Sequence, residues 1–457
     1  MYDIAIIGGG PGGYASALYA HNFGLSVALI EKDRVGGTCL LRGCIPAKTW
    51  IESSHVFATV AGAAEFGVQS SAPEFVWPTA LERKKKVVEL LVNGLSGTLK
   101  ARGVDVIEGH GRITGVGTVS VEASDGSVSD VEARNIIIAT GSGPATIPGY
   151  EIDGTNIVTS DEALDWSTQP RRVAIIGGGV IGVEFASFLG ELGSEVHIFE
   201  MLDQLVPGME PEAAKILARS FRRRSIKAHT GVGVGPARIG EDSVTVPFGD
   251  DSVEVDVVLV AVGRTPITSD VGLAAVGVHS DRGFISVDAA TMRTTAEGVY
   301  AVGDVVAGTP QLAHVGFAEA IAAVTHIATG DSAAVDYNAI PMVVYTNPEI
   351  GWVGLTEAAA VESGVSIETA EHGMRGIGRA IIQGEVGGTV KIVSETDGPI
   401  VGATVVGPGA GELIHELMYA VGWEALPAEA ASFIHAHPTI AEAIGETLLA
   451  SAGKPLH

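Results

Sequence analysis

The amino-acid sequence predicts an α/β protein in which two related α/β units are followed by a C-terminal α+β unit. The first observation is length, because 457 residues at roughly 150 residues per domain correspond to about three domains. The second is an internal repeat: residues 5–13 recur as residues 174–182, at a constant offset of 169 positions. The third is that strand-like runs at 389–393 and 401–406 precede helical segments near the C-terminus.

Composition limits the class of protein. The 28 basic and 54 acidic residues give a net charge of −26, which repels phosphate backbones, so no nucleic acid partner is expected. The 46% hydrophobic content is too high for a disordered acidic chain. No run of about 18 uninterrupted apolar residues occurs, and no basic segment with a cleavage site opens the chain. We therefore expect a cytoplasmic protein without membrane association.

Each copy of the repeat carries G-x-G-x-x-G between a strand and a helix, with an acidic residue about 20 positions later. The first glycine permits a tight turn, the second lets the backbone approach a pyrophosphate at the helix N-terminus, and the third lets helix and strand pack closely. A glycine-rich turn in an ordinary α/β core would not explain an acid at the same spacing in both copies. The sequence thus predicts two Rossmann-like dinucleotide-binding units, with sites at Gly8, Gly10, Gly13 and Glu31 and at Gly177, Gly179, Gly182 and Glu200.

The acid of the second copy indicates which nucleotide binds there. A carboxylate at Glu200 accepts hydrogen bonds from a ribose 2′-hydroxyl and repels a 2′-phosphate, so NAD is favoured over NADP. The alternative is that Glu200 is a solvated strand end.

Cys39 and Cys44 are the two cysteines of the chain, and in such a chain a close pair is redox-active, half of a metal site, or two inert thiols. No metal site is expected, because no second pair lies at ligand spacing. Residues five apart in a regular helix are roughly 8–9 Å apart, whereas a disulfide needs less than about 7 Å. A bond between them therefore requires a break in the helix, which Gly43 permits. Pro46 suits the first turn of a following helix, so Cys44 would lie near a helix N-terminus, which favours a thiolate.

The segment Gly-Gly-Thr-Cys-Leu-Leu-Arg-Gly-Cys-Ile-Pro-Ala-Lys at 36–48 closely resembles the redox-disulfide segment of the flavin-dependent pyridine nucleotide–disulfide oxidoreductases. The resemblance extends over essentially the whole chain, including residues 138–142, 261–266, 298–304 and 435–442. Within that family the chain is most similar to the dihydrolipoamide dehydrogenase branch. The resemblance implies FAD at the first site, NAD at the second, a reversible Cys39–Cys44 disulfide, and oxidation of dihydrolipoamide to lipoamide with NAD+ as acceptor.

The same resemblance implies further cofactor contacts. Positions that match FAD contacts, beyond those of the first glycine motif, are Lys48, His110, Gly111, Thr140, Gly141, Asp304, Leu312, Ala313 and His314. Positions that match NAD contacts, beyond those of the second motif, are Val232 and Gly263. Lys48 matches a lysine near flavin N5 that pairs with a glutamate, here Glu184. On the residues alone Lys48 is equally an ordinary solvated lysine, although its spacing from Cys44 places both on one helical face.

His437 and Glu442 are a second polar pair of interest. A neutral imidazole accepts a thiol proton near pH 7, and a carboxylate fixes its tautomer. On the residues alone a histidine beside a proline is more often structural, and His435 shares that ambiguity. The resemblance implies that His437 is the base, that it acts on the disulfide of the other subunit, and that the protein is a homodimer with shared active sites. The implied partners are dihydrolipoyl groups of acyltransferases or of glycine cleavage H-type carriers, and the implied role is the E3 component of such complexes.

We expect four segments: the FAD-binding domain at 1–145, an inserted NAD-binding domain at 146–270, a return to the FAD-binding domain at 271–336, and a C-terminal dimerisation domain at 337–457. The charge runs at 83–86 and 222–224 are interpreted as solvated helix faces, with an anion site as the alternative for each.

Two departures from the family pattern stand out. Arg42 lies between the cysteines, where it either favours a thiolate or faces solvent, and Val315-Gly316-Phe317 replace a more polar stretch.

Rival functions are a glutathione or mycothione reductase that uses NADPH, and a mainly bridging subunit of a dehydrogenase complex. Mercuric reductase is disfavoured, because no cysteine pair lies at the C-terminus.

Overall fold

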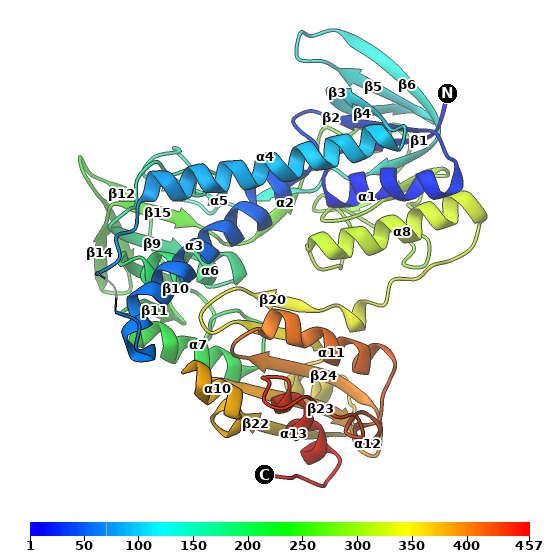
Figure 1. The fold of residues 1–457 in the computed structure, drawn as a ribbon. Helices are drawn as coiled ribbons and strands as arrows, with labels where there is room; N and C mark the ends of the chain where they lie inside the picture. The colour runs from blue at the N-terminus through cyan, green and yellow to red at the C-terminus, as the bar shows by residue number, and fades with distance from the viewer. Residues whose placement is uncertain (70) are drawn as a thin grey trace.

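The computed structural model describes residues 1–69 and 71–457. It confirms the predicted fold class, with two Rossmann-like units and a separate C-terminal unit built on an antiparallel sheet (Figure 1). None of the helices in the described part of the chain has the length and apolar character that a membrane crossing requires.

The first unit is a parallel sheet in the order β3-β2-β1-β6, to which β19 adds beside β6. Its strands are β1 (Tyr2–Ile7), β2 (Val27–Glu31), β3 (Asp105–Glu108), β6 (Val128–Ile138) and β19 (Val299–Ala301). A meander of β4 (His110–Gly115) and β5 (Thr118–Glu122) continues antiparallel from β6. Helices α1 (Pro11–Ala20) and α8 (Ala313–Thr329) lie side by side against this sheet, and the long α4 (Trp77–Ala101) crosses above them (Figure 1).

The second unit is a five-stranded parallel sheet in the order β11-β10-β9-β15-β8. Its strands are β8 (Ile157–Val158), β9 (Arg172–Ile176), β10 (Glu195–Glu200), β11 (Lys227–Thr230) and β15 (Val257–Val260). Its helices are α5 (Ser160–Ala163), α6 (Val180–Glu191) and α7 (Pro211–Arg223), and an antiparallel sheet of β12 (Arg238–Ile239), β13 (Val244–Phe248) and β14 (Asp251–Val255) adjoins it. The chain leaves the first unit at β7 (Ser142–Pro144) and returns at β16 (Arg264–Pro266), and these two strands pair antiparallel. The second unit is therefore an insertion held at a two-stranded neck.

The C-terminal unit is an antiparallel sheet in the order β20-β21-β24-β23-β22. Its strands are β20 (Met342–Val344), β21 (Ile350–Gly354), β22 (Ile367–Gly373), β23 (Thr389–Glu395) and β24 (Ile400–Val406). Helix α11 (Ala410–Gly422) packs on β21 and β24, and α13 (Glu442–Ser451) packs on β22 and β23. The shorter helices α9 (Glu357–Glu362), α10 (Gly378–Gln383) and α12 (Pro427–Ala430) lie at its edges.

The interpretation of the two charge runs as solvated faces is wrong for one member of each run. Lys84 is buried, and its ammonium pairs with Asp165 at 2.6 Å. Arg224 donates to Glu191 at 3.2 Å and to the carbonyl of Asn347 at 2.8 Å. Both side chains tie helices to neighbouring segments that are distant in sequence, so local patterning gave no sign of their partners.

A buried ionic cluster joins the inserted unit to the C-terminal unit. Lys391 on β23 donates to Glu210, which precedes α7, at 2.8 Å and to Glu357 on α9 at 2.5 Å. The side chain of Glu210 is only 3% exposed and also accepts from the backbone N–H of Glu357 at 2.6 Å. A buried carboxylate is stable only when it is paired. The pairing of Glu210 with Lys391 therefore fixes the position of the inserted unit relative to the C-terminal unit.

We predict that Lys391→Met destabilises the FAD-loaded protein by about 3–5 kcal/mol, because it leaves Glu210 charged and unpaired in the interior. Urea denaturation followed by tryptophan fluorescence measures this loss. The matched control is the double variant Glu210→Gln with Lys391→Met, which removes both charges and should recover part of the stability. Equal losses in the single and double variants would contradict the proposed pairing.

Candidate active site

The two cysteines lie on either side of a break between two helices. Helix α2 (Gly37–Arg42) ends at Gly43, whose φ of −143° and ψ of −112° are not helical, and α3 (Cys44–Gly62) begins at Cys44. Pro46 occupies the first turn of α3. The predicted helix break at Gly43 is therefore confirmed, and Cys44 lies at a helix N-terminus, where the dipole favours an anion.

The two thiols have opposite acidities. Both cysteines are free thiols in this structure, with Cys39 half-buried and Cys44 exposed. The hydrogen bond to Cys44 and burial raise the pKa of Cys39. The hydrogen bond from Cys39, together with the positive charge of Lys48, outweighs the partial desolvation of Cys44 by surrounding protein and lowers its pKa to about 7. The first negative charge on the reduced pair therefore forms on Cys44, with half of the molecules ionised near pH 7.

Lys48 is held by a buried ion pair rather than solvated. Its ammonium donates to both carboxylate oxygens of Glu184 on α6, at 3.0 and 2.7 Å. The side chain of Glu184 is 5% exposed and also accepts from the backbone N–H of Tyr345 at 3.0 Å. Although burial opposes the charge, Glu184 raises the pKa of Lys48. The predicted Lys48–Glu184 pair is present, and the ammonium stays protonated over the neutral pH range.

Tyr345 completes this contact and was missed by sequence reasoning. Its ring lies under the ammonium of Lys48, 4.8 Å from the ring centroid, a cation–π distance. Tyr345 follows β20 of the C-terminal unit, so all three units meet at Lys48. The sequence carried no signal for this, because the contact joins positions that are distant in the chain.

The glycine loops of both units leave room for a dinucleotide. A Cβ at Gly179 would have no neighbour within 4 Å, and one at Gly10 would meet only Gly37, at 3.7 Å. No side-chain hydrogen bond caps the N-terminus of α1 or α6, so backbone N–H groups in the first turn of each helix are available to an anion. In contrast, a Cβ at Gly13 or Gly182 would collide with the first glycine of its motif. The residues present therefore fit a pyrophosphate at each helix N-terminus.

The remaining predicted FAD contacts gather around the first loop. Gly109 N–H donates to the carbonyl of Glu31 at 2.9 Å, which places His110 and Gly111 beside the acid that would hold the adenosine ribose. Thr140 Oγ1 donates to the carbonyl of Ile267 at 2.6 Å, and Gly141 has a left-handed φ of 72°. Leu312 and Ala313 open α8, and His314 Nε2 bonds to the carbonyl of Pro341 at 2.9 Å.

Asp304 is held in a polar network at the neck. Ser142 Oγ donates to its carboxylate at 2.5 Å. Arg264 donates from Nε to Ser142 Oγ at 2.7 Å and lies 3.9 Å from Asp304. The strand pair β7–β16 that bounds the insertion thus also orients Asp304.

Glu319 is a buried acid that sequence reasoning missed. It lies on α8 with no exposed surface, accepts from the Gly303 N–H at 2.5 Å and from the Tyr337 hydroxyl at 2.9 Å. Burial raises its pKa to about 7. A lone glutamate among alanines on a helix was the available signal. The carboxyl anchors the turn that carries Asp304.

The departure at Val315-Gly316-Phe317 has a packing reason. A Cβ at Gly316 would lie 3.3 Å from the backbone nitrogen of Gly12, so glycine lets α8 approach α1 closely. Phe317 packs against Tyr14, with tilted rings whose centroids are 5.7 Å apart. The other departure, Arg42, pairs with Asp33, which compensates its charge locally.

In the second unit the acid is fixed by the glycine loop. Glu200 is 9% exposed and accepts from the N–H groups of Gly178 at 2.7 Å and Leu202 at 2.9 Å. The alternative of a solvated strand end is therefore wrong. Val232 N–H donates to the Glu200 carbonyl at 3.1 Å, and Gly263, at φ 124°, faces open space. These positions surround the carboxyl edge of the sheet, where a nucleotide binds.

His437 and Glu442 form a directed pair. His437 Nδ1 and Glu442 Oε1 are 2.8 Å apart, and Glu442 Oε2 accepts from the Thr439 N–H at 2.9 Å. That backbone bond, then His437, lowers the pKa of Glu442. The His437 side chain is 78% exposed, whereas that of His435, paired with Glu416, is 14% exposed. Of the two histidines, only His437 presents its outer nitrogen to another molecule.

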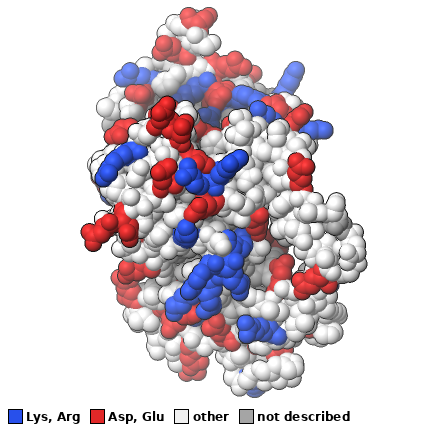
Figure 2. All heavy atoms as spheres, turned by 90° about the vertical axis from the view of Figure 1, so that its left-hand side faces the viewer, with Lys and Arg blue, Asp and Glu red and all other residues white. Residues whose placement is uncertain are grey.

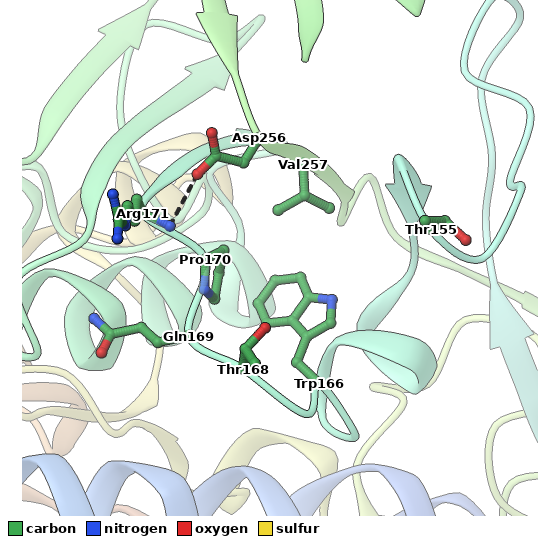
Figure 3. Close-up of a pocket in the computed structure, with 8 residues that line it drawn as sticks. All are labelled: Thr155, Trp166, Thr168, Gln169, Pro170, Arg171, Asp256 and Val257. Carbon is green, nitrogen blue, oxygen red and sulfur yellow. Dashed lines mark hydrogen bonds between the residues drawn. The ribbon is translucent and has the colours of Figure 1, made fainter. Parts of the chain in front are cut away.

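A surface pocket of about 360 Å³ elsewhere in the inserted unit is not part of this site. Its lining includes Trp166, Gln169, Arg171 and Asp256, with Arg171 N–H bonded to Asp256 at 3.0 Å (Figure 3). Arg171 and Asp256 precede β9 and β15, so the pocket lies at the amino edge of the sheet, opposite the nucleotide edge. Within the described residues, no three His, Cys, Asp or Glu side chains are grouped as a metal site requires.

Comparison with known families agrees with this geometry. Residues 2–320 match the model for pyridine nucleotide-disulphide oxidoreductases, and residues 340–448 match the dimerisation domain of the same proteins. The chain belongs to the pyridine nucleotide-disulphide oxidoreductase family and is an FAD-dependent disulfide oxidoreductase. The second match supports a homodimer.

Individual relatives align along the whole chain. Dihydrolipoyl dehydrogenase from Bacillus subtilis is 37% identical over 100% of this chain and 99% of its own length. Leghemoglobin reductase from Glycine max is 38% identical over 99% of this chain and 88% of its own. Among solved structures, LpdA from Mycobacterium tuberculosis has a TM-score of 0.92 at 30% identity, covering 98% of this chain and 99% of that one. The flavoprotein disulfide reductase RclA from Escherichia coli has a TM-score of 0.87 at 26% identity, with 98% of each chain covered.

We predict that in the reduced protein the first thiolate belongs to Cys44 and forms with a midpoint near pH 7. Cys39→Ala removes the donor, so the midpoint should rise toward the ordinary thiol value of 9.0, while Cys39→Ser keeps a donor and should stay near 7. Site-resolved alkylation rates with iodoacetamide across pH measure each midpoint by mass spectrometry. Faster alkylation of Cys39 than of Cys44 at pH 7 would reverse the assignment.

Proposed function

We propose that the protein oxidises dihydrolipoamide to lipoamide with NAD+ as acceptor, through a reversible Cys39–Cys44 disulfide. The observation that carries the proposal is the polarised thiol pair, with the pKa of Cys44 lowered to about 7 beside Lys48. Full-length similarity to dihydrolipoyl dehydrogenases supports the choice of substrate.

The first step belongs to the substrate and the cysteines. One substrate thiol loses its proton to His437 of the partner subunit, and its sulfur attacks Cys39 of the oxidised pair. The Cys39–Cys44 bond breaks, and Cys44 leaves as the thiolate that its low pKa favours. The second substrate thiol then attacks the mixed disulfide and gives its proton to Cys39, whose raised pKa favours the thiol, and lipoamide is released. Two electrons now reside on the cysteine pair.

The chain's other groups stabilise and orient the reduced cysteine pair for electron transfer to the cofactor. An FAD held at the first glycine loop would supply the two-electron acceptor for the cysteine pair, and NAD+ at the second loop would be the final acceptor. Lys48 keeps a fixed positive charge beside the thiolate, Glu184 holds that ammonium in place, and Glu442 orients His437. Two observations support a role of His437 at the disulfide of a second subunit. Its side chain is exposed, and in the described residues no hydrogen bond joins it to either cysteine of its own chain.

Dihydrolipoyl groups on acyltransferase or glycine cleavage H-type carriers are the proposed partners, so the chain would act as an E3 component.

A second candidate function is reduction of another low-molecular-weight disulfide, which similarity to RclA favours. The two differ in direction and in nucleotide, so kinetics can separate them.

We predict that kcat/KM for dihydrolipoamide with NAD+ exceeds that for glutathione disulfide or mycothione with NADPH by more than about 100-fold, a difference of about 3 kcal/mol in transition-state stabilisation. Steady-state assays of the FAD-loaded dimer compare the three reactions. Cys44→Ser should abolish lipoamide turnover and leave FAD bound. Full lipoamide activity in that variant, or faster turnover with either NADPH pair, sinks the proposal.

We also predict that Glu200→Gln narrows the preference for NAD+ over NADP+ by about 10–100-fold, because it removes a charged hydrogen-bond acceptor for the 2′-hydroxyl and the repulsion of a 2′-phosphate. The ratio of kcat/KM values for the two nucleotides measures this change. The equivalent change at the first unit, Glu31→Gln, should leave that ratio unaltered. A wild-type enzyme that prefers NADP+ would contradict the assignment.

A further inference from the structure

Helix α7 carries an exposed basic face that the proposed chemistry does not use. Arg219, Arg222 and Arg223 line a surface hollow of about 360 Å³, and all three side chains are exposed. Their spacing places them on one side of the helix. Figure 2 shows basic side chains gathered in the middle of the face on which α7 lies, bordered by acidic ones.

This concentration of charge is unusual for so acidic a chain. With 54 acidic residues against 28 basic ones, most exposed cations would have a carboxylate nearby. Neighbouring cations do: Lys215 on α7 pairs with Glu212 at 2.5 Å, and the half-buried Arg224, which follows α7, pairs with Glu191. In the described part of the chain, however, none of the three arginines lies within 4.0 Å of a carboxylate. Like charges three and four positions apart destabilise a helix.

The helix dipole accounts for only part of this arrangement. Arg222 and Arg223 lie in the last turn of α7, where positive charge is favourable, but Arg219 lies before it. The opposite face of α7 is packed against the protein. Phe221 is fully buried, and Ser220 donates a hydrogen bond to the Asn347 carbonyl at 2.7 Å. The arginines are therefore presented from a rigid support.

The location excludes a role in nucleotide binding. Helix α7 follows the carboxyl end of β10 and runs back toward the start of β11. Its last two turns therefore lie at the amino edge of the parallel sheet, opposite Glu200 and the glycine loop.

We propose that this arginine face is a docking site for a short acidic segment of another protein, rich in Asp and Glu. The planar guanidinium binds carboxylates through paired hydrogen bonds. A short segment matches the three positive charges, whereas a nucleic acid would extend its phosphates over the surrounding acidic surface and be repelled. This inference goes beyond the proposed redox function and does not depend on it.

The test uses the FAD-loaded full chain and a fluorescent synthetic peptide of alternating glutamate and glycine, with fluorescence anisotropy as the readout at low salt. The triple variant Arg219→Ala, Arg222→Ala and Arg223→Ala should weaken binding about tenfold or more. The matched control, Arg83→Ala, Lys85→Ala and Lys86→Ala, removes three exposed charges from α4 and should bind as the wild type does. The bound FAD content and the thermal midpoint should be the same in all three proteins, which shows that the variants are folded.

Several outcomes overturn the proposal. Equal binding by the triple variant and the wild type would show that the arginine face does not bind the peptide. Equal weakening in the α4 control would show that binding depends on net charge alone. Tighter binding of a single-stranded DNA of equal charge would assign the face to nucleic acid. Assemblies larger than the dimer that form in the wild type and are lost in the triple variant would make a second copy of this chain the occupant.

Discussion

The ion pair between Lys48 and Glu184 is the constraint on which the active-site geometry depends. Glu184 lies on α6 at 5% side-chain exposure, and an isolated carboxylate at that depth would cost several kcal/mol. Its partners come from different units: Lys48 from the first, and the Tyr345 N–H from the C-terminal unit. Satisfying one buried charge therefore fixes three units relative to one another. Because α3 carries both Lys48 and Cys44, it also fixes the thiol.

This arrangement separates two roles that a dithiol must fill. One sulfur has to accept attack from a substrate, and the other has to leave as a stable anion. Both start with the same intrinsic acidity, so the difference must come from their surroundings. The hydrogen bond from Cys39, together with the charge of Lys48, stabilises negative charge on Cys44. The hydrogen bond that Cys39 donates to Cys44, then burial and the neighbouring anion, disfavour negative charge on Cys39.

Local patterns predicted what depends on local chemistry. The glycine spacings, the acids after the second strands and the helix break at Gly43 could all be predicted from the sequence. Each of these features is required by the sterics or hydrogen bonding of the backbone close to it in the chain. The partners of Tyr345, Glu319 and Lys391 could not be predicted from the sequence, because each partner is brought close only by the tertiary fold. His435 and His437 show the same limit: their sequence contexts are alike, and only burial of the former separates them.

The duplication explains why the cysteines lie where they do. In each unit the chain returns to the glycine loop after the acid: the N–H of Gly36 donates to the Gly9 carbonyl, and that of Val206 to the Gly178 carbonyl, both at 2.8 Å. In the second unit this returning chain leads into α7, whereas in the first it leads directly into α2 and α3. The redox helices are thus set against the first dinucleotide loop by a backbone hydrogen bond common to both copies. Because that bond needs neither sulfur, the position of the cysteines beside the cofactor loop is a property of the repeated fold, and the cysteine side chains add only the chemistry.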